Sequence, residues 1–223
     1  MPTPSYREAS TPRHRGFGHP FQAELAELLA WRRDVRHFRT DPVPEAVIER
    51  LLDLACLAPS VGNSQPWRFV TVDAPERRAA IIANYEAANG QALGGYRGER
   101  AALYAALKLS GLKEAPVHLA VFNDEATAQG RGLGRMTMPE TLRYSSVIAV
   151  HTLWLAARAR GLGLGWVSIL DPAAAARALD VPQDWWLIAY LCIGWPVADD
   201  IEPELQQRGW QGRESACRTV LRR

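Results

Sequence analysis

The stretch YSSVIAVHTLWLAA, residues 144–157, decides the fold of this chain. It is apolar around most of a helical circumference, so a helix over 142–160 would be buried on several sides, inside a domain or between two subunits. His151 lies within it, and no second metal-ligating residue follows three or four positions later. The pattern predicts a central helix whose histidine is buried and satisfied by a neighbour.

Shorter elements surround this helix. Leucines at helical spacing predict a helix over 21–33, and a second helix runs from Pro44 to the Pro- and Gly-containing stretch at 58–66. The remaining pattern predicts helices over 75–89, 101–112 and 171–181, a glycine-rich break over 90–100, and strands over 67–73, 117–124, 166–170 and 185–195. Because no regular βαβ alternation is present, we expect an α+β sandwich with one modest sheet covered by helices.

Composition narrows the class of protein. The chain has 223 residues and a net charge of +2, which argues against nucleic acid or an anionic membrane as a partner. Three cysteines without a CxxC pair argue against a zinc site or a disulfide framework and favour a cytoplasmic location. No apolar run reaches the roughly 18 residues of a membrane span. Residues 1–20 read as a mobile arm and 214–223 as a tail, which leaves one domain over 21–213.

An unusual density of charge follows the first predicted helix, in WRRDVRHFRTDPVP at 31–44. Arg32, Arg33 and Arg36 are spaced so that their guanidinium groups could surround one anion, and arginine binds phosphate oxygens in a two-pronged manner. The alternative is a solvated helix end whose cations complement the helix dipole. Spacing alone does not separate the two interpretations.

Glycine clusters raise the question of a dinucleotide fold. The cluster GLGLG, residues 161–165, follows a helix and leads into a strand, the reverse of the order that such a fold requires. We expect Gly161 to cap the helix, and Gly163 and Gly165 to let a flat ligand approach the backbone. A serine hydrolase is excluded because the chain has no GxSxG. Arginines beside small polar loops suit a planar phosphorylated ligand, and flavin mononucleotide (FMN) fits that description.

Three motifs together carry a family resemblance: RRDVR at 32–36, APSVGNSQPWRFV at 58–70 and LWLAARARGLGLGWVSI at 153–169. In this order they resemble the flavin-dependent nitroreductase superfamily, over about residues 22–213. Most members carry a serine after the arginine pair, where this chain has Asp34. That aspartate, with GERAALYAALKLSGLKEAP and GWVSIL, is similar to the branch of 5,6-dimethylbenzimidazole synthases.

The resemblance implies a nitroreductase-like sandwich with a mixed central sheet of about four to five strands, in an intertwined homodimer with FMN at the subunit interface. It also implies that reduced FMN is a substrate, broken down with O2 to 5,6-dimethylbenzimidazole, the lower ligand of vitamin B12, and erythrose 4-phosphate. A separate flavin reductase would supply reduced FMN, and no metal is implied. The implied FMN-binding residues are Arg32, Arg33, Asp34, Val35, Arg36, Ser60, Gly62, Gln65, Leu109, Gly165, Trp166 and Ser168, with Ser60, Gly62 and Gln65 contributed by the other subunit.

Asp34 and Ser168 are the residues that the resemblance assigns to catalysis. Asp34 would act as a base, with nearby arginines favouring its ionised form, and Ser168 would donate or accept one hydrogen bond. Gly94 and Gly95 occupy a lid-like region, where Tyr96 could close the site instead of a bulkier residue. Two alternatives stay open. One is an NAD(P)H-dependent FMN nitroreductase or oxidoreductase, with a cobalt-corrinoid reductase as a variant, and the other is a non-catalytic flavin-binding protein.

Overall fold

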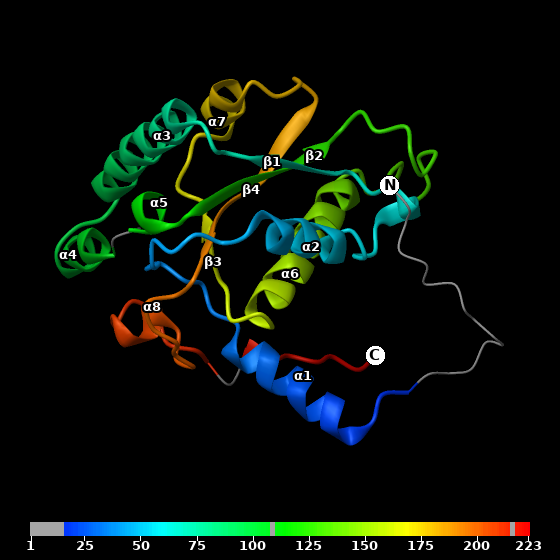
Figure 1. The fold of residues 1–223 in the computed structure, drawn as a ribbon, viewed down its shortest axis with the longest axis horizontal. Helices are drawn as coiled ribbons and strands as arrows, with labels where there is room; N and C mark the ends of the chain where they lie inside the picture. Colours follow the sequence, from blue (N-terminus) through cyan, green and yellow to red (C-terminus); the bar gives the residue numbers. More distant parts are fainter. Residues whose placement is uncertain (1–15, 108–109, 215–216) are drawn as a thin grey trace.

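The computed structural model describes residues 16–107, 110–214 and 217–223, and its centre is a four-stranded sheet (Figure 1). The strands are β1 (Trp67–Thr71), β2 (Val117–Asp124), β3 (Gly163–Val167) and β4 (Trp185–Gly194), in the order β1-β2-β4-β3. All three pairings between them are antiparallel, so the prediction of a mixed sheet was wrong. The connections from β1 to β2 and from β3 to β4 each start and finish at one end of the sheet, which makes the joined strands antiparallel.

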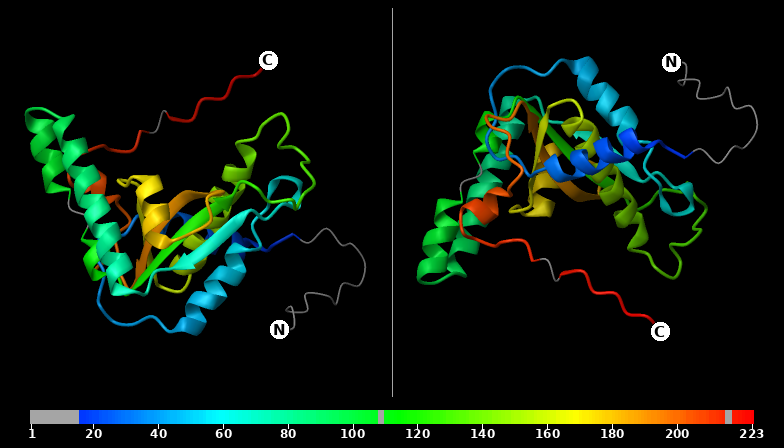
Figure 2. Two further views of the ribbon diagram at one scale, coloured as in Figure 1. Left: turned by 90° about the horizontal axis from the view of Figure 1, so that it is seen from above. Right: turned by 90° about the horizontal axis from the view of Figure 1, so that it is seen from below.

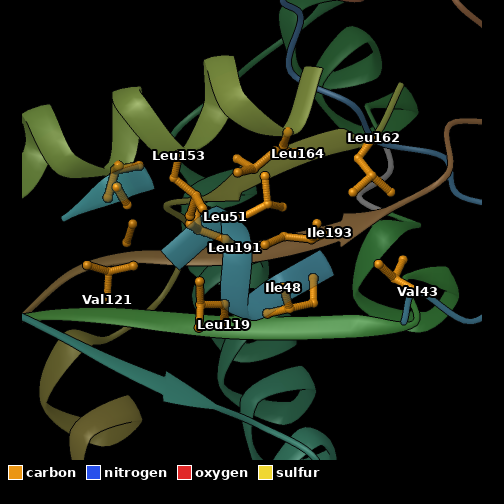
Figure 3. Packing of buried hydrophobic residues seen from close by; sticks show 14 residues of the cluster. Val43, Ile48, Leu51, Leu119, Val121, Leu153, Leu162, Leu164, Leu191 and Ile193 are labelled. Carbon is orange, nitrogen blue, oxygen red and sulfur yellow. The ribbon is translucent and has the colours of Figure 1, made fainter. Parts of the chain in front are cut away.

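Helices cover both faces of the sheet, and alternation along the central strands assigns residues to each face. One face packs on α2 (Glu45–Ala55) and α6 (Thr141–Arg158) through a cluster that includes Leu119, Val121, Leu191 and Ile193 (Figure 3). The other face packs on α3 (Pro75–Gly94) and α7 (Pro172–Leu179) through a second cluster, to which the intervening positions Ala120, Phe122, Tyr190 and Cys192 belong. The two-residue period of the strands therefore builds two cores, one on each face.

Helix α6 is the long central helix that the sequence predicts, but only part of its circumference is buried. Val150, Leu153 and Ala157 are fully buried in the first cluster. On the outward side Tyr144, Val147 and Ile148 are 53%, 40% and 42% exposed. His151 lies on that exposed side, seven residues after Tyr144, so the prediction of a buried histidine was wrong.

Several boundaries differ from the predicted ones. Helix α1 (His19–Trp31) begins inside the predicted arm, of which residues 1–15 lie outside the described part of the chain. Helix α3 continues through Gly90 to Gly94, because one glycine costs a helix only about 1 kcal/mol and a 20-residue helix can absorb it. The helix predicted over 101–112 is replaced by α4 (Glu99–Ala106) and α5 (Gly111–Glu114). Strand β3 begins at Gly163 rather than at 166, because Gly163 still pairs with Gly194 of β4.

The C-terminal part of the chain contacts Arg33, just after α1, through Ile201 and then leaves the body. After β4 it forms the short helix α8 (Glu204–Gln207), and residues 217–223 project from the body as exposed chain (Figure 2). The three cysteines are free. In the described ranges no helix is both long and apolar enough to cross a membrane.

Candidate functional site

The segment 32–36 lies along the edge of the sheet, against β3. Asp34 forms a parallel bridge with Leu164, and the Val35 N–H donates to the Leu164 carbonyl oxygen at 3.1 Å. A Cβ atom on Gly165 would overlap the Val35 carbonyl oxygen, and one on Gly163 would lie 2.8 Å from the Val35 side chain. The two glycines were expected to admit a flat ligand, whereas in this structure they admit the chain at Val35. Gly161 does end α6, with a φ of +74° and its N–H on the Arg158 carbonyl.

The Asp34 carboxyl group is held from two sides. Its Oδ1 accepts a hydrogen bond from the Trp166 backbone N–H at 2.9 Å, and its Oδ2 lies 3.4 Å from the Arg36 Nε. Desolvation by the surrounding protein raises the pKa of Asp34, although the Trp166 N–H and Arg36 act in the opposite direction. The prediction that a nearby arginine favours the ionised form is confirmed for Arg36, but desolvation is the larger effect and the pKa of Asp34 is raised on balance. A raised pKa makes the carboxylate a stronger base.

The two arginines at the end of α1 have different surroundings. The Arg33 guanidinium donates to the Ile201 carbonyl oxygen, at 2.7 Å from Nε, and to the Arg32 carbonyl oxygen, at 2.8 Å from Nη1. It thereby fastens the C-terminal segment to the site. The Arg32 guanidinium lies over the Trp154 ring, 4.8 Å from its centroid. That Arg33 contacts a phosphate stays a prediction, and in this conformation its donors are engaged by carbonyl groups.

A third cation near this pair was missed by the sequence reasoning. Burial lowers the pKa values of Arg32 and Arg33, and the nearby charge of Arg213 lowers both further. Three guanidinium groups therefore repel one another at one place, and a bound dianion would relieve that repulsion. The residues present fit the phosphate of FMN in this respect. Arg213 lies 180 residues after Arg33 in a polar stretch, and no local signal marks it.

A cavity of about 290 Å³ adjoins Arg33 and Asp34. Its lining includes residues 33–37 and Trp154, and a second group of lining residues lies within 197–208 of the C-terminal segment. That second group includes acidic residues: the charge of Asp200 acts on Arg33, and Asp199 pairs with Arg158. The C-terminal segment therefore supplies a wall of the candidate site as well as a cation.

The loop 60–65 forms a second polar feature, away from this cavity. The Ser60 Oγ accepts a hydrogen bond from the Gln65 N–H at 3.0 Å. Gly62, Asn63 and Gln65 have φ angles of 56°, 54° and 45°, which is unusual for the two residues that are not glycine. Ser64 is 2% exposed, and its hydroxyl group has no hydrogen-bond partner within the described chain. Strain and an unsatisfied buried group mark this loop as a candidate binding surface.

Helix α6 fixes the distance between the two features. The Val61 N–H donates to the Ser145 Oγ at 3.0 Å, and the Trp154 indole N–H donates to the Arg33 carbonyl oxygen at 3.1 Å. Nine residues of helix separate the two anchors, an axial rise of about 14 Å. One chain thus holds loop 60–65 well away from Asp34. That loop 60–65 of another subunit completes the site stays a prediction.

The other predicted site residues lie as follows. Gly165 and Trp166 belong to β3, and Ser168 is the first exposed residue after that strand. Leu109 lies outside the described residues. Near the predicted lid, Tyr96 stacks on Tyr104 with ring centroids 4.8 Å apart and meets the Trp210 ring at 5.6 Å, so this region contacts the C-terminal segment. In the part of the chain that the structure describes, no cluster of three or more residues could hold a metal ion.

Comparison with known proteins defines the class. Residues 29–195 match the model of the nitroreductase family, and the chain therefore belongs to that family. It is similar to the 5,6-dimethylbenzimidazole synthase of Rhodospirillum rubrum, with 60% identity over 197 residues that cover 88% of this chain and 93% of the relative. Identity to a 5,6-dimethylbenzimidazole synthase of Rhodobacter capsulatus is 55% over 187 residues, 84% of this chain and 90% of the relative.

A solved structure has the same fold. The crystal structure of oxidized iodotyrosine deiodinase bound to FMN and 3-iodo-L-tyrosine superposes with a TM-score of 0.69 at 24% identity, over 89% of this chain and 97% of that chain. The α+β nitroreductase-like sandwich that the sequence predicts, with its four-stranded sheet and covering helices, is thereby confirmed.

Proposed function

We propose that this chain is a 5,6-dimethylbenzimidazole synthase, which fragments reduced FMN with dioxygen to 5,6-dimethylbenzimidazole and erythrose 4-phosphate. The observation that carries the proposal is the 60% identity to the synthase of Rhodospirillum rubrum over 93% of that relative's length. The seating of Asp34 between the Trp166 amide and Arg36 supports it, because such a carboxylate is placed to move a proton. A separate flavin reductase would supply reduced FMN.

The residues of this chain would divide the work. Arg32 and Arg213 would bind the phosphate, with Arg33 holding the C-terminal wall in place. When bound, reduced FMN supplies the electrons for dioxygen and the carbon skeleton of the product. Asp34 would take a proton through Oδ2, because the Trp166 N–H holds Oδ1 at 2.9 Å whereas the Arg36 Nε lies at 3.4 Å from Oδ2. Ser168, exposed at the end of β3, would orient that proton transfer through its hydroxyl group.

The working form would be a homodimer. The outward side of α6 presents Tyr144, Val147 and Ile148, and α1 has no buried residue while Phe21, Leu25 and Leu29 are 40–46% exposed. Exposed apolar surface of this kind is typical of a subunit interface. The rise of about 14 Å along α6 between the anchor of loop 60–65 at Ser145 and the anchor of the Asp34 segment at Trp154 supports the same arrangement. In a dimer, the loop of one subunit could complete the site of the other.

A second candidate is an ordinary NAD(P)H-dependent FMN oxidoreductase. The chain is 33% identical over 177 residues to an NADH dehydrogenase of Thermus thermophilus, which covers 75% of this chain. That similarity is much lower than the similarity to the synthases. Rapid oxidation of NAD(P)H by the FMN-loaded protein, with the flavin left intact, would favour this second function.

The test uses a single turnover. Reduced FMN is mixed with stoichiometric protein without oxygen, air is admitted, and 5,6-dimethylbenzimidazole is measured by mass spectrometry. Wild type should form the product, and Asp34→Asn should bind FMN but form at least about a hundredfold less, as expected for loss of a general base. Asp41→Asn removes an exposed carboxylate that pairs with Arg39 and should leave the yield unchanged. Intact reoxidised FMN from wild type would overturn the proposal.

A further inference from the structure

Trp154 contacts three parts of the candidate site: the Arg33 backbone, the Arg32 guanidinium group and Trp166 of β3. It stands near the C-terminal end of α6, partly buried against the first core cluster. Its indole Nε1 donates to the Arg33 carbonyl oxygen at 3.1 Å. The Arg32 guanidinium lies 4.8 Å above its ring, and the Trp166 ring lies 6.3 Å away at 49°.

The hydrogen bond to Arg33 acts directly on Asp34. The Arg33 carbonyl and the Asp34 N–H belong to one planar peptide unit, so a donor that fixes the carbonyl also fixes the orientation of that unit. The Asp34 side chain starts from the next atom of the chain and must reach the Trp166 N–H at 2.9 Å. Rotation of the peptide would move the carboxyl group away from this donor.

The ring of Trp154 performs a separate task. A guanidinium group over an indole face is held by cation–π attraction, which keeps Arg32 against Trp154 of α6. Packing against Trp166 ties the same ring to β3, the strand whose amide holds Asp34. One side chain thus links the cation, the peptide before the carboxylate, and the strand behind it.

We propose that Trp154 is a positioning residue for the fragmentation reaction. Its indole N–H orients the 33–34 peptide so that the Asp34 carboxyl group stays bonded to the Trp166 N–H and directed at the substrate proton it would take, and its ring supports Arg32. The inference rests on the proposed function, since it assigns Trp154 a role toward the base of that reaction. The side chain has two roles, hydrogen bonding by its N–H and support of Arg32 by its ring. A substitution can remove the N–H and keep a ring.

The first experiment compares Trp154→Phe with Trp195→Phe. The control removes the same kind of bond, since the Trp195 Nε1 donates to the Pro42 carbonyl oxygen at 3.4 Å outside the residues that line the cavity. For Trp154→Phe we expect the Kd for oxidised FMN, measured by quenching of flavin fluorescence, to stay within about threefold, since Phe keeps a weaker ring platform. The single-turnover rate of product formation should fall at least about tenfold, because small misplacements of a catalytic group are costly.

Two activity results would overturn the inference. One is a Trp154→Phe rate equal to that of Trp195→Phe, and the other is a rate loss that saturating FMN restores fully, which would mean that the tryptophan only supports binding. Should Phe at 154 fail to fold, the substitution Trp154→3-benzothienylalanine, introduced at this site alone, keeps the ring shape and replaces the N–H by sulfur. It should give the same loss of rate.

A second readout does not depend on activity. The Asp34 carboxyl resonance can be titrated in flavin-free protein, where Arg32, Arg36, Glu204 and Cys192 are its charged or titratable neighbours. Because the hydrogen bond from the Trp166 N–H lowers the pKa of Asp34, loosening the 33–34 peptide should weaken that bond and raise the pKa further in Trp154→Phe, and leave it unchanged in Trp195→Phe. An unchanged titration in Trp154→Phe overturns the inference. If wild type forms no product but this shift occurs, the proposed function fails and the positioning of Asp34 by Trp154 stands.

Discussion

The segment 32–36 and the loop 60–65 are both hydrogen-bonded to α6, but they differ in how many of their polar groups have hydrogen-bond partners within the chain. In the segment, the Val35 N–H, the Arg33 carbonyl and the Asp34 carboxyl group all have partners in the same chain. In the loop, two residues other than glycine have positive φ angles, and the buried Ser64 hydroxyl has no partner within the described chain. The segment is therefore preorganised, whereas the loop has the strain and the unsatisfied group of a surface that a ligand or partner completes.

The largest expected effect comes from Gly165→Ala, which breaks the contact between the segment 32–36 and β3. The added methyl group would overlap the Val35 carbonyl oxygen, so the segment must leave β3. We expect a loss of about 3 kcal/mol or more in the free energy of unfolding, measured with urea, together with loss of FMN binding.

The control for that change is Gly90→Ala. A Cβ at Gly90, inside the last part of α3, meets nothing within 4 Å, so this variant should gain up to about 1 kcal/mol in the free energy of unfolding. Wild-type stability of Gly165→Ala would mean that the segment does not lie against β3.

A smaller effect is expected from the same change in the loop, Gly62→Ala. Its φ angle is 56°, and its Cβ would lie 2.9 Å from the Leu133 carbonyl oxygen. The loss should be about 1–3 kcal/mol in urea unfolding. Gly209→Ala is the matched control, because it has a φ of 72° and open space around its Cβ, so it measures backbone strain alone. Equal losses for the two variants would argue against a close contact between loop 60–65 and residues 130–134.

Replacing the Asp34 carboxyl group tests how strongly the segment buries it, through the dependence of stability on pH. Burial raises the pKa of Asp34 in the folded state, so wild-type stability falls as pH rises from the ordinary value of 3.8 through the raised value. Flavin-free Asp34→Asn should therefore melt at an equal or higher temperature than wild type at pH 7, and the difference should vanish below pH 3.8.

Asp41→Asn should show the opposite sign. The hydrogen bond from Arg39 lowers the pKa of Asp41, so its contribution is present at neutral pH and is lost as pH falls through the lowered value. A melting temperature of Asp34→Asn that is lower than wild type at pH 7 would mean that the hydrogen bond from the Trp166 N–H outweighs desolvation.

The smallest effect is expected from Ser64→Ala in the loop. Removing a buried hydroxyl group without a partner should leave the flavin-free stability unchanged or raise it by up to about 1 kcal/mol. Ser146→Ala is the control, because the Ser146 hydroxyl donates to the Asn123 Oδ1 at 2.8 Å and its loss should cost about 1–2 kcal/mol. A comparable cost for Ser64→Ala would show that its hydroxyl group is satisfied, and the contrast between the two regions would weaken.

Local patterns were enough for some of the fold. The apolar stretch at 144–157 predicted the central helix, and two short, largely apolar runs predicted β2 and β4. Patterns failed where a contact distant in sequence decides the outcome. Gly163 enters β3 only because Gly194 pairs with it, and His151 is exposed only because the core lies on the other side of α6. Strand direction was also beyond reach, since it depends on the end of the sheet to which each connection returns.

By itself the sequence determined the chemistry that is available: arginines around an aspartate, small residues in the loop at 58–66, and a family resemblance that the comparisons confirm. Only the tertiary structure decided how these groups act. It brings Arg213 to Arg32 and Arg33, engages Arg33 with Ile201, and raises the pKa of Asp34 where neighbouring charges alone would lower it. The physical reason is that the spacing of charged residues can be seen in a short stretch of sequence, whereas the desolvation of a side chain such as Asp34 depends on every atom that folding packs around it.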